Sequence, residues 1–210
     1  TAYSDSRLRS VRNWLVCRNI GAYSDVRLAC SRAAGDFLFG RGRYEELPNA
    51  IDVETYRFKE PVRTDVRARL GLGDTPVVGH VGRFSEQKNH RFLIDVYTEL
   101  ARLRPEARLM LIGDGPLRPG IEEIVAERGL TDRVLFLGDR GDVAALYQAM
   151  DMFLLPSFYE GLPMVGVEAQ CAGLPLVCSK EVTDEVAIGE ATFLSLEKPA
   201  RQWAHHVSQA

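Results

Sequence analysis

Two glutamates, Glu160 and Glu168, are separated by seven residues in the segment 157–172. Pro163 suits the first turn of a helix, because its fixed φ is helical and its missing N–H is not needed there. A helix beginning near Pro163 leaves Glu160 in a loop and places Glu168 about one and a half turns in. A carboxylate on an apolar stripe is costly unless something hydrogen-bonds it, and we expect ligand hydroxyls to do so. No Lys or Arg can pair with Glu168 locally, since its neighbours three and four positions away are Met164, Val165, Cys171 and Ala172.

Two cations lie in the segment 81–90, where a strand is expected to end at Gly82 and a helix to begin near Asn89, a favourable N-cap residue. Arg83 and Lys88 would then lie at the carboxyl edge of the sheet, where open α/β folds bind ligands. A lysine beside a helix N-terminus opposes the macrodipole, and an anion there would satisfy both. Two solvated surface cations are the alternative, but the nearby glutamate-bearing helix favours an anion site.

Two further loops follow predicted strands. Gly113 and Gly115 flank an aspartate, but the third glycine of a dinucleotide-binding fingerprint is missing and Pro116 follows. We therefore interpret this segment as a structural turn that needs glycine for backbone reasons. In the loop 136–142, Arg140 either stacks on a flat base or is a solvated arginine, and both interpretations stay open.

Strands and helices alternate from about Thr75 onward. Short apolar runs without polar alternation are typical of a parallel sheet covered on both faces. The predicted fold class is therefore α/β, a Rossmann-like parallel sheet with helices on both faces. Apolar runs predict strands at 77–81, 108–112, 134–137, 152–155 and 174–178. Helical spacing predicts helices over 92–103, 121–127 and 143–150, and from Pro163 to Gly173.

Residues 1–43 differ in character, with eight arginines, no lysine and three acidic residues. This charge asymmetry indicates two pieces of different origin. We expect a helix over 6–20, a strand over 25–30, a helix over 31–39 capped by Ser31, and a connector over 47–58.

Composition narrows the class of protein. The chain has 210 residues, of which 46% are hydrophobic and 26% charged, as in ordinary globular proteins. It shows neither a membrane-spanning apolar stretch nor a leader with a cleavage site, so we expect a cytoplasmic protein. No basic stripe is interleaved with aromatic residues, which argues against nucleic-acid binding. No Asp-x-Asp occurs, so we expect a site without metal or cofactor.

The cysteines and histidines lack a functional pattern. Their spacing is neither that of a C-x-x-C motif nor that of metal ligands. We expect reduced, mostly buried thiols at Cys17, Cys30, Cys171 and Cys178, and solvated or hydrogen-bonded imidazoles at His80, His90, His205 and His206.

Taken together, these motifs resemble the retaining GT-B glycosyltransferases of glycosyltransferase family 4. The resemblance covers most of residues 44–178 and runs, in order, through 48–52, 81–83 with 88–89, 111–116, 134–138, 149–157, 160–163 and 168–175. It implies the C-terminal half of a GT-B fold, which carries a nucleotide-sugar donor while an N-terminal domain carries the acceptor. By that resemblance, residues 1–47 are the tail of the acceptor domain plus a connector. Residues 48–210 are the donor domain, expected to be truncated at its end.

The resemblance also implies roles for individual residues. Glu168 would hold the ribose hydroxyls, and Arg83 and Lys88 would neutralise the diphosphate together with the helix at Pro163. Glu160 would hold the donor sugar. Glu160, Arg83 and Lys88 are thus the expected catalytic residues. The backbone amides of Gly161, Leu162 and Met164 would help Glu160 to hold the sugar, and Leu137 and Arg140 would face the base. The remaining expected donor-binding positions are Gly82 and Val165.

The activity implied is transfer of a sugar, with retention, from a nucleotide diphosphate to a glycan or lipid-linked acceptor. The family favours uridine and often builds surface polysaccharides at the cytoplasmic membrane face, whereas this piece alone is expected to be inactive. A sugar-nucleotide epimerase of the same architecture and a non-catalytic nucleotide-binding module are the alternatives. A glycoside hydrolase is disfavoured because the strand-edge cations would have no role. An NAD-dependent oxidoreductase is disfavoured because the first βα turn lacks Gly-x-Gly-x-x-Gly.

Overall fold

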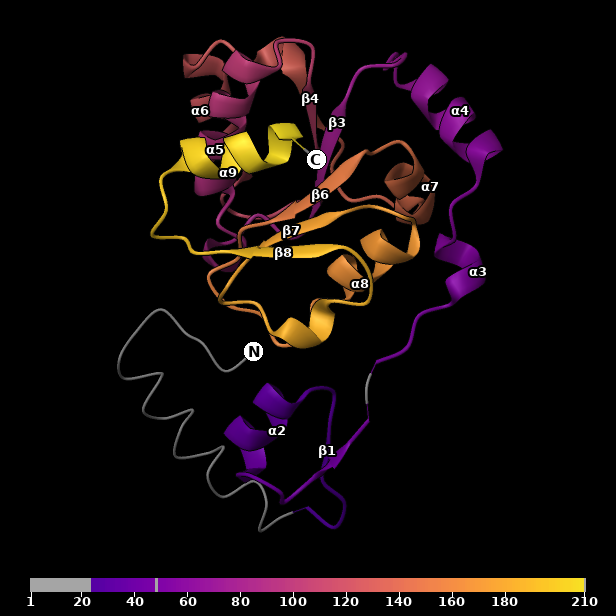
Figure 1. Cartoon of the computed structure of the whole chain (residues 1–210), viewed down its shortest axis with the longest axis vertical. Helices are drawn as coiled ribbons and strands as arrows, with labels where there is room; N and C mark the ends of the chain where they lie inside the picture. The colour runs from indigo at the N-terminus through magenta and orange to yellow at the C-terminus, as the bar shows by residue number, and fades with distance from the viewer. Residues whose placement is uncertain (1–23, 48, 210) are drawn as a thin grey trace. The chain divides into compact units, whose positions relative to one another are not determined.

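Six parallel strands form the central sheet, in the order β5-β4-β3-β6-β7-β8 (Figure 1). After β3 the chain builds outward through β4 and β5, then crosses to the other side of β3 and continues through β6, β7 and β8. The order therefore reverses between β3 and β6, which is the place where such sheets bind ligands. The strands are β3 (Val77–Val81), β4 (Arg108–Ile112), β5 (Val134–Phe136), β6 (Met152–Leu155), β7 (Leu176–Ser179) and β8 (Ala191–Leu194).

This computed structural model describes residues 24–47 and 49–209. The chain divides into two compact units, with the boundary between Ala50 and Ile51. The sheet belongs to the second unit. None of the helices in the described ranges is long and apolar enough to cross a membrane.

Helices cover both faces of the sheet (Figure 1). Strand side chains alternate between the faces, so Leu109 and Leu111 of β4 enter one core cluster while Met110 and Ile112 enter the other. The first cluster packs under α5 (His90–Leu103), α6 (Arg118–Glu127) and α9 (Ala200–Gln209). The second packs under α4 (Glu60–Arg69), α7 (Val143–Gln148) and α8 (Met164–Cys171). The predicted fold class, a Rossmann-like parallel sheet covered on both faces, is confirmed.

Most predicted strands and helices of this unit are present with small shifts. The strands at 77–81, 108–112 and 152–155 match their predicted bounds, whereas β5 ends one residue early and β7 begins at Leu176. Pro163 lies just before α8 as its N-cap rather than inside its first turn. The sequence did not predict α4, β8, α9 or three short 3-10 turns, η2 (Glu86–Lys88), η3 (Thr131–Arg133) and η4 (Asp184–Val186).

The expectation that residues 47–58 form only a connector was wrong in part. They contain the short helix α3 (Val53–Tyr56), because the Asp52 side chain accepts hydrogen bonds from the Glu54 amide at 3.1 Å and the Thr55 hydroxyl at 2.8 Å. These bonds, with that from Thr55 foremost, lower the pKa of Asp52. An N-cap aspartate thus starts a turn of helix that the apolar pattern does not reveal.

In the first unit, β1 (Leu28–Ala29) pairs in parallel with β2 (Glu45–Glu46). Between them, α2 (Arg32–Phe39) is capped by Ser31, whose hydroxyl accepts from the Ala34 amide at 3.2 Å, as predicted. The predicted strand over 25–30 shrinks to two residues, and the predicted helix over 6–20 lies outside the described residues.

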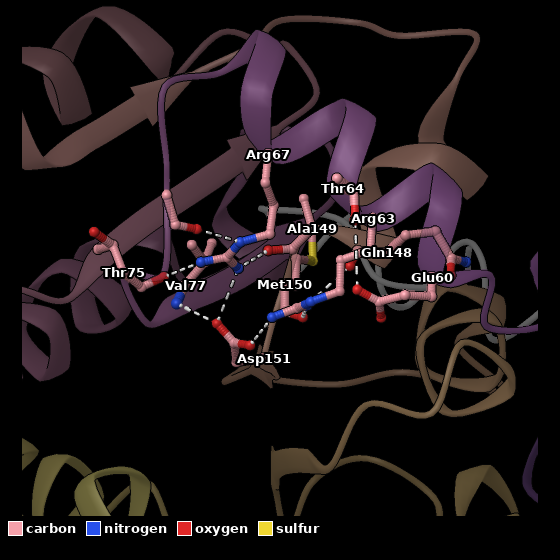
Figure 2. Close-up of polar contacts among 11 residues, drawn as sticks. Glu60, Arg63, Thr64, Arg67, Thr75, Val77, Gln148, Ala149, Met150 and Asp151 are labelled. Atoms are coloured by element: carbon pink, nitrogen blue, oxygen red, sulfur yellow. Dashed lines mark hydrogen bonds and ion pairs between the residues drawn. The ribbon is translucent and has the colours of Figure 1, made fainter.

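A buried polar network ties α4 to the amino ends of the central strands (Figure 2). Arg67 is 7% exposed and donates to Ala149 O at 2.8 Å, to Gly73 O at 2.8 Å and to Asp151 at 3.3 Å. Asp151 also accepts from Arg63 at 2.6 Å and from the Val77 amide at the start of β3 at 2.8 Å. The carboxylate therefore joins Arg63 and Arg67 of the helix to the sheet.

Candidate functional site

A hollow of about 540 Å³ lies where β3, β4 and β5 end, at the carboxyl edge of the sheet. It brings together three predicted donor-binding residues from two motifs, Gly82 and Arg83 from one and Arg140 from the other. Its remaining lining comes from Val81, Ile112, Gly113, Asp114, Gly115, Asp139 and Val143. Leu137, predicted beside them, is half-buried and does not line the hollow, and its amide donates to Leu111 O at 2.9 Å.

The glycine turn after β4 supports the loop that carries Arg83. A Cβ atom on Gly113 would lie 2.3 Å from Gly82 O, and one on Gly115 would lie 2.5 Å from Phe84 O. Both glycines have positive φ, +125° and +156°. The two loops are also hydrogen-bonded, since the Phe84 amide donates to Asp114 O at 3.0 Å. The interpretation of this segment as a structural turn is confirmed.

Arg83 and Arg140 differ in how they are held. Arg140 donates two hydrogen bonds to Asp142, both at 2.8 Å, and this bond raises the pKa of the arginine. Arg140 is therefore an exposed but ion-paired side chain at the rim of the hollow. Arg83 is exposed, and among the described residues no carboxylate lies within ion-pair distance of it.

Lys88 and Glu160, predicted from different motifs, contact each other directly. The Lys88 ammonium lies 2.7 Å from Glu160 Oε1, and the two side chains are 15% and 9% exposed. Two further donors complete the carboxylate's partners, the Ser157 hydroxyl at 2.9 Å and the Gln87 amide at 3.1 Å. The site thus holds a buried, preformed cluster whose negative and positive groups both lie next to the strand ends.

Asn89 is the N-cap residue of α5, as predicted, but its side chain does not cap the helix. Asn89 adopts a left-handed conformation, with φ of 53°, and makes no side-chain cap bond. Its amide group donates instead to Pro156 O at 3.1 Å, at the end of β6. Asn89 therefore connects the loop after β3 to the loop that carries Glu160.

Glu168 has a protein partner, contrary to the expectation from its local neighbours. The hydroxyl of Tyr147, on α7, lies 3.0 Å from Glu168 Oε2. Burial, followed by the Glu168 carboxylate, raises the pKa of Tyr147 well above its ordinary value, and the same two causes raise the pKa of Tyr56 on α3. The sequence marks Tyr147 only as part of an apolar helical stripe, so nothing in its spacing reveals this contact.

The start of α8 offers backbone amides to a ligand. Gly161 and Leu162 lie in the loop before the helix, and Met164 is its first residue. Among the described residues, no acceptor is found for the amides of Leu162 and Met164, whereas Gly161 directly follows Glu160, which forms a parallel β-bridge with Val182. Val165, also predicted, uses its carbonyl as an acceptor for Tyr147, at 3.2 Å.

Two histidines behind the Arg83 loop do not behave as expected. His80 and His90 are buried, with ring centroids 4.8 Å apart, and His90 stacks on Phe84 at 4.0 Å. His80 Nδ1 is 2.8 Å from Leu154 O, but its Nε2 and both nitrogens of His90 have no hydrogen-bond partner among the described residues. Burial and the nearby charge of Lys88 lower the pKa of His90 to about 4, and burial lowers the pKa of His80 well below its ordinary value.

The expectation of solvated or hydrogen-bonded imidazoles was therefore wrong for His90, and it holds for only one nitrogen of His80. Both rings are neutral parts of the core. In the described ranges, no group of three or more His, Cys, Asp or Glu side chains is arranged to hold a metal ion. Cys178 is a buried free thiol, whereas Cys30 and Cys171 are half-buried, and Cys17 lies outside the described residues.

Comparisons with known proteins fit this geometry. Residues 75–210 match the family model described as glycosyl transferases group 1. The chain is 39% identical over 201 residues to EpsF of Bacillus subtilis (strain 168), named as a glycosyltransferase, covering 92% of this chain and 52% of that protein. It is 30% identical over 171 residues to 2-deoxystreptamine glucosyltransferase of Streptomyces kanamyceticus, covering 80% of this chain and 44% of that enzyme.

Solved structures share the fold as well. The structure of Anabaena Alr3699/HepE in complex with UDP superposes with a TM-score of 0.82 at 25% identity, covering 95% of this chain and 58% of that chain. The chain therefore spans about half the length of each of these relatives.

Proposed function

Because this chain belongs to the glycosyl transferases group 1 family, as its resemblance predicted, we propose that the intact protein transfers a sugar from a uridine diphosphate sugar to a glycan or lipid-linked acceptor, with retention at the sugar carbon. The observation that carries the proposal is that Arg83 and Lys88 follow β3 while Glu160 and Glu168 follow β6, the two strands between which the order reverses, and that Lys88 contacts Glu160 directly. The two cations had been assigned to donor binding from one motif and the two glutamates from others.

In this proposal the diphosphate lies between Arg83 and Lys88. Cleavage of the sugar–phosphate bond leaves its electron pair on the diphosphate oxygen and positive character on the sugar. Two cations and the amino end of α8 oppose the developing negative charge. Removing one such preorganised stabiliser typically costs roughly 3–4 kcal/mol of barrier.

The ion pair between Lys88 and Glu160 can persist while the donor binds. An ammonium has three N–H donors, so Lys88 can hold Glu160 and a phosphate oxygen together. The carboxylate of Glu160 has lone pairs beyond those used by its present partners, and these would accept from sugar hydroxyls. The amides of Leu162 and Met164, for which no acceptor is found among the described residues, would complete the sugar subsite together with that of Gly161.

For retention, the acceptor hydroxyl attacks the sugar carbon from the face that the diphosphate leaves. Its proton passes to the departing diphosphate oxygen, so the step balances without a protein base. No metal ion is included in this proposal, because the two cations supply the positive charge. Within the chain, Glu160, Arg83 and Lys88 are the proposed catalytic residues, since they touch the reacting groups.

The donor base and acceptor are proposals that rest on relatives. The complex of the Anabaena protein with UDP supports a uridine donor. We assign donor binding to residues 48–210 and the acceptor to an N-terminal domain whose tail is residues 1–47, so that this chain alone binds donor without transferring sugar. We place the intact protein in the cytoplasm, peripheral to the inner face of the membrane, in surface glycoconjugate synthesis.

Product analysis tests the proposal against its alternatives. The intact protein is incubated with radiolabelled UDP-glucose and a membrane extract that contains lipid-linked acceptors, and the products are separated by chromatography. We expect label in a new glycoside of retained configuration, and none when Arg83 and Lys88 are both replaced by alanine. Label in an epimerised nucleotide sugar would support the epimerase, and unchanged donor that binds the chain would support a non-catalytic module.

A further inference from the structure

We propose that Tyr147 is a positioning residue for Glu168, holding one carboxylate oxygen so that the remaining lone pairs face the ribose hydroxyls of the donor. This inference rests on the proposed function, since it assigns the ribose to Glu168. Tyr147 lies outside the predicted motifs, and because its side chain is fully buried it would not contact the donor itself.

The geometry fixes the tyrosine ring. Tyr147 is 0% exposed and packs against Phe153 of β6, with ring centroids 5.7 Å apart and planes at 62°. The ring of Tyr56 lies 6.1 Å away on another side. A side chain enclosed in this way has one rotamer available, so its hydroxyl is a fixed point.

The hydroxyl of Tyr147 contacts a single turn of α8. It lies 3.0 Å from Glu168 Oε2 and 3.2 Å from Val165 O, three residues earlier on the same helix. A phenol has one proton to donate, and the charged carboxylate is both the nearer and the stronger acceptor. Since burial and the carboxylate raise the pKa of Tyr147 well above 10.0, the hydroxyl remains a donor in neutral solution.

The carboxylate needs such an anchor. Glu168 is half-exposed on a helix whose residues three and four positions away are apolar, so none of these neighbours restrains it. An unrestrained glutamate would lose rotamer freedom on binding a ligand, which weakens affinity. Because Tyr147 holds Oε2, the rotamer freedom of Glu168 is already lost when the chain folds. Its other oxygen, Oε1, takes no part in the bond to Tyr147.

Calorimetry of the 210-residue chain with two nucleotides tests the inference. The probes are uridine diphosphate and 2′-deoxyuridine diphosphate, which differ by one ribose hydroxyl. The variants are Tyr147→Phe, which removes only the hydroxyl, and Glu168→Gln. Tyr97→Phe is the matched control, because Tyr97 is also buried but belongs to the other core cluster. Its hydroxyl lies within hydrogen-bond distance of two backbone carbonyls, Ala107 O at 2.8 Å and Arg133 O at 3.1 Å, and of no carboxylate among the described residues.

We expect the wild-type chain to bind uridine diphosphate more tightly than the deoxy analogue. Tyr147→Phe should weaken uridine diphosphate roughly tenfold, the size of one hydrogen bond, and should reduce the preference over the deoxy analogue. Adding Tyr147→Phe to Glu168→Gln should change the preference little further, because the two act on one contact. Tyr97→Phe should lower the melting temperature by a similar amount as Tyr147→Phe while keeping the preference.

Two results separate the inference from the proposed function. If Tyr147→Phe destabilises the chain but keeps the wild-type preference, Tyr147 is a packing residue and the inference is overturned, while the proposed function stands. If the wild-type chain does not bind uridine diphosphate, the proposed function itself is contradicted. Should Tyr147→Phe fail to fold, Glu168→Asp tests the same contact, because it keeps the charge but withdraws it from the hydroxyl. A full preference in that variant would also overturn the inference.

Discussion

At the scale of single residues, the charges of the site are already arranged before any ligand is present. Lys88 is neutralised by Glu160, whose other partners are Gln87 and Ser157. Arg83 is the cation of the site for which no carboxylate partner is found among the described residues. Arg83 should therefore dominate the recognition of a bound diphosphate.

Arg83→Ala should weaken uridine diphosphate by roughly ten- to a hundredfold, the range for a charge-assisted hydrogen bond, and should leave uridine nearly unaffected. Titration calorimetry with both ligands measures the two effects separately. Arg201→Ala is the matched control, because Arg201 is an exposed arginine on α9 outside the site. Equal losses for nucleotide and nucleoside would argue against a phosphate contact.

The residue types of the site could be predicted from sequence, but their partners could not. The sequence marks Arg83 and Lys88 as cations that follow an apolar strand, and it marks Glu160 and Glu168 as carboxylates in a loop and on the apolar stripe of the helix after it. The contact between Lys88 and Glu160 joins residues 72 positions apart, and that between Tyr147 and Glu168 joins residues 21 apart. Local spacing carries no signal for either, since only the crossing of the chain between strands brings them together.

At the scale of elements, the turn after β4 depends on the absence of two side chains. Gly113 lies so close to the carbonyl of Gly82 that a Cβ atom would displace the loop of Arg83.

Gly113→Ala should destabilise the chain by about 2–4 kcal/mol, combining backbone strain with the clash, and should also weaken nucleotide binding. Gly129→Ala is the matched control, since Gly129 has a similarly positive φ of +66° but nothing within 4 Å of its Cβ position. Gly129→Ala should lower the free energy of unfolding by only about 1 kcal/mol. Urea unfolding measures both, and equal losses would show that the contact with Gly82 is unimportant.

The buried polar network around Arg67 of α4 also belongs to the scale of elements. Arg67→Ala should destabilise the chain by about 3–5 kcal/mol, because it leaves Asp151 and the carbonyls of its three backbone acceptors with fewer partners in a buried region. These acceptors are Gly73, Thr75 and Ala149. Arg69→Ala, on the same helix, removes an exposed ion pair with Asp65 and should cost less than about 1 kcal/mol. Chemical denaturation of both variants gives the comparison, and a small effect of Arg67→Ala would contradict a structural role for the network.

This network also explains why α4 was not predicted. The helix is held by its arginines as well as by its one buried apolar side chain, Val66, so hydrophobic periodicity does not mark it. The edge strand β8 was missed for a related reason, because none of its residues is fully buried. The central strands were predicted correctly because both of their faces are covered, which leaves a continuous apolar run in the sequence.

At the scale of the whole molecule, the neutral histidines couple stability to pH. Burial and the nearby charge of Lys88 lower the pKa of His90 from its ordinary value of 6.5 to about 4 in the folded state. As pH falls below 6.5, the unfolded chain takes up a proton that the folded chain refuses. The stability that neutral His90 gives the folded chain is therefore fully present above pH 6.5 and is lost as pH falls towards 4.

We expect the free energy of unfolding to fall by about 3 kcal/mol between pH 6.5 and 4 through His90 alone, with a further loss from His80. His90→Phe should flatten this part of the curve, because the ring nitrogens have no partners to lose and a phenyl ring can still stack on Phe84. Denaturation at a series of pH values provides the measurement. An unchanged slope in His90→Phe would exclude His90 as its source.

The strand order has a consequence for biogenesis. One of the two central strands, β3, begins at Val77, whose amide donates to Asp151, 74 positions downstream in the chain. The same strand pairs with β6, which follows Asp151. A nascent chain that has emerged only as far as β5 therefore keeps one edge of β3 unpaired. Contacts so distant in sequence slow folding, and a polypeptide stalled at that length would present an apolar, hydrogen-bonding edge to other chains.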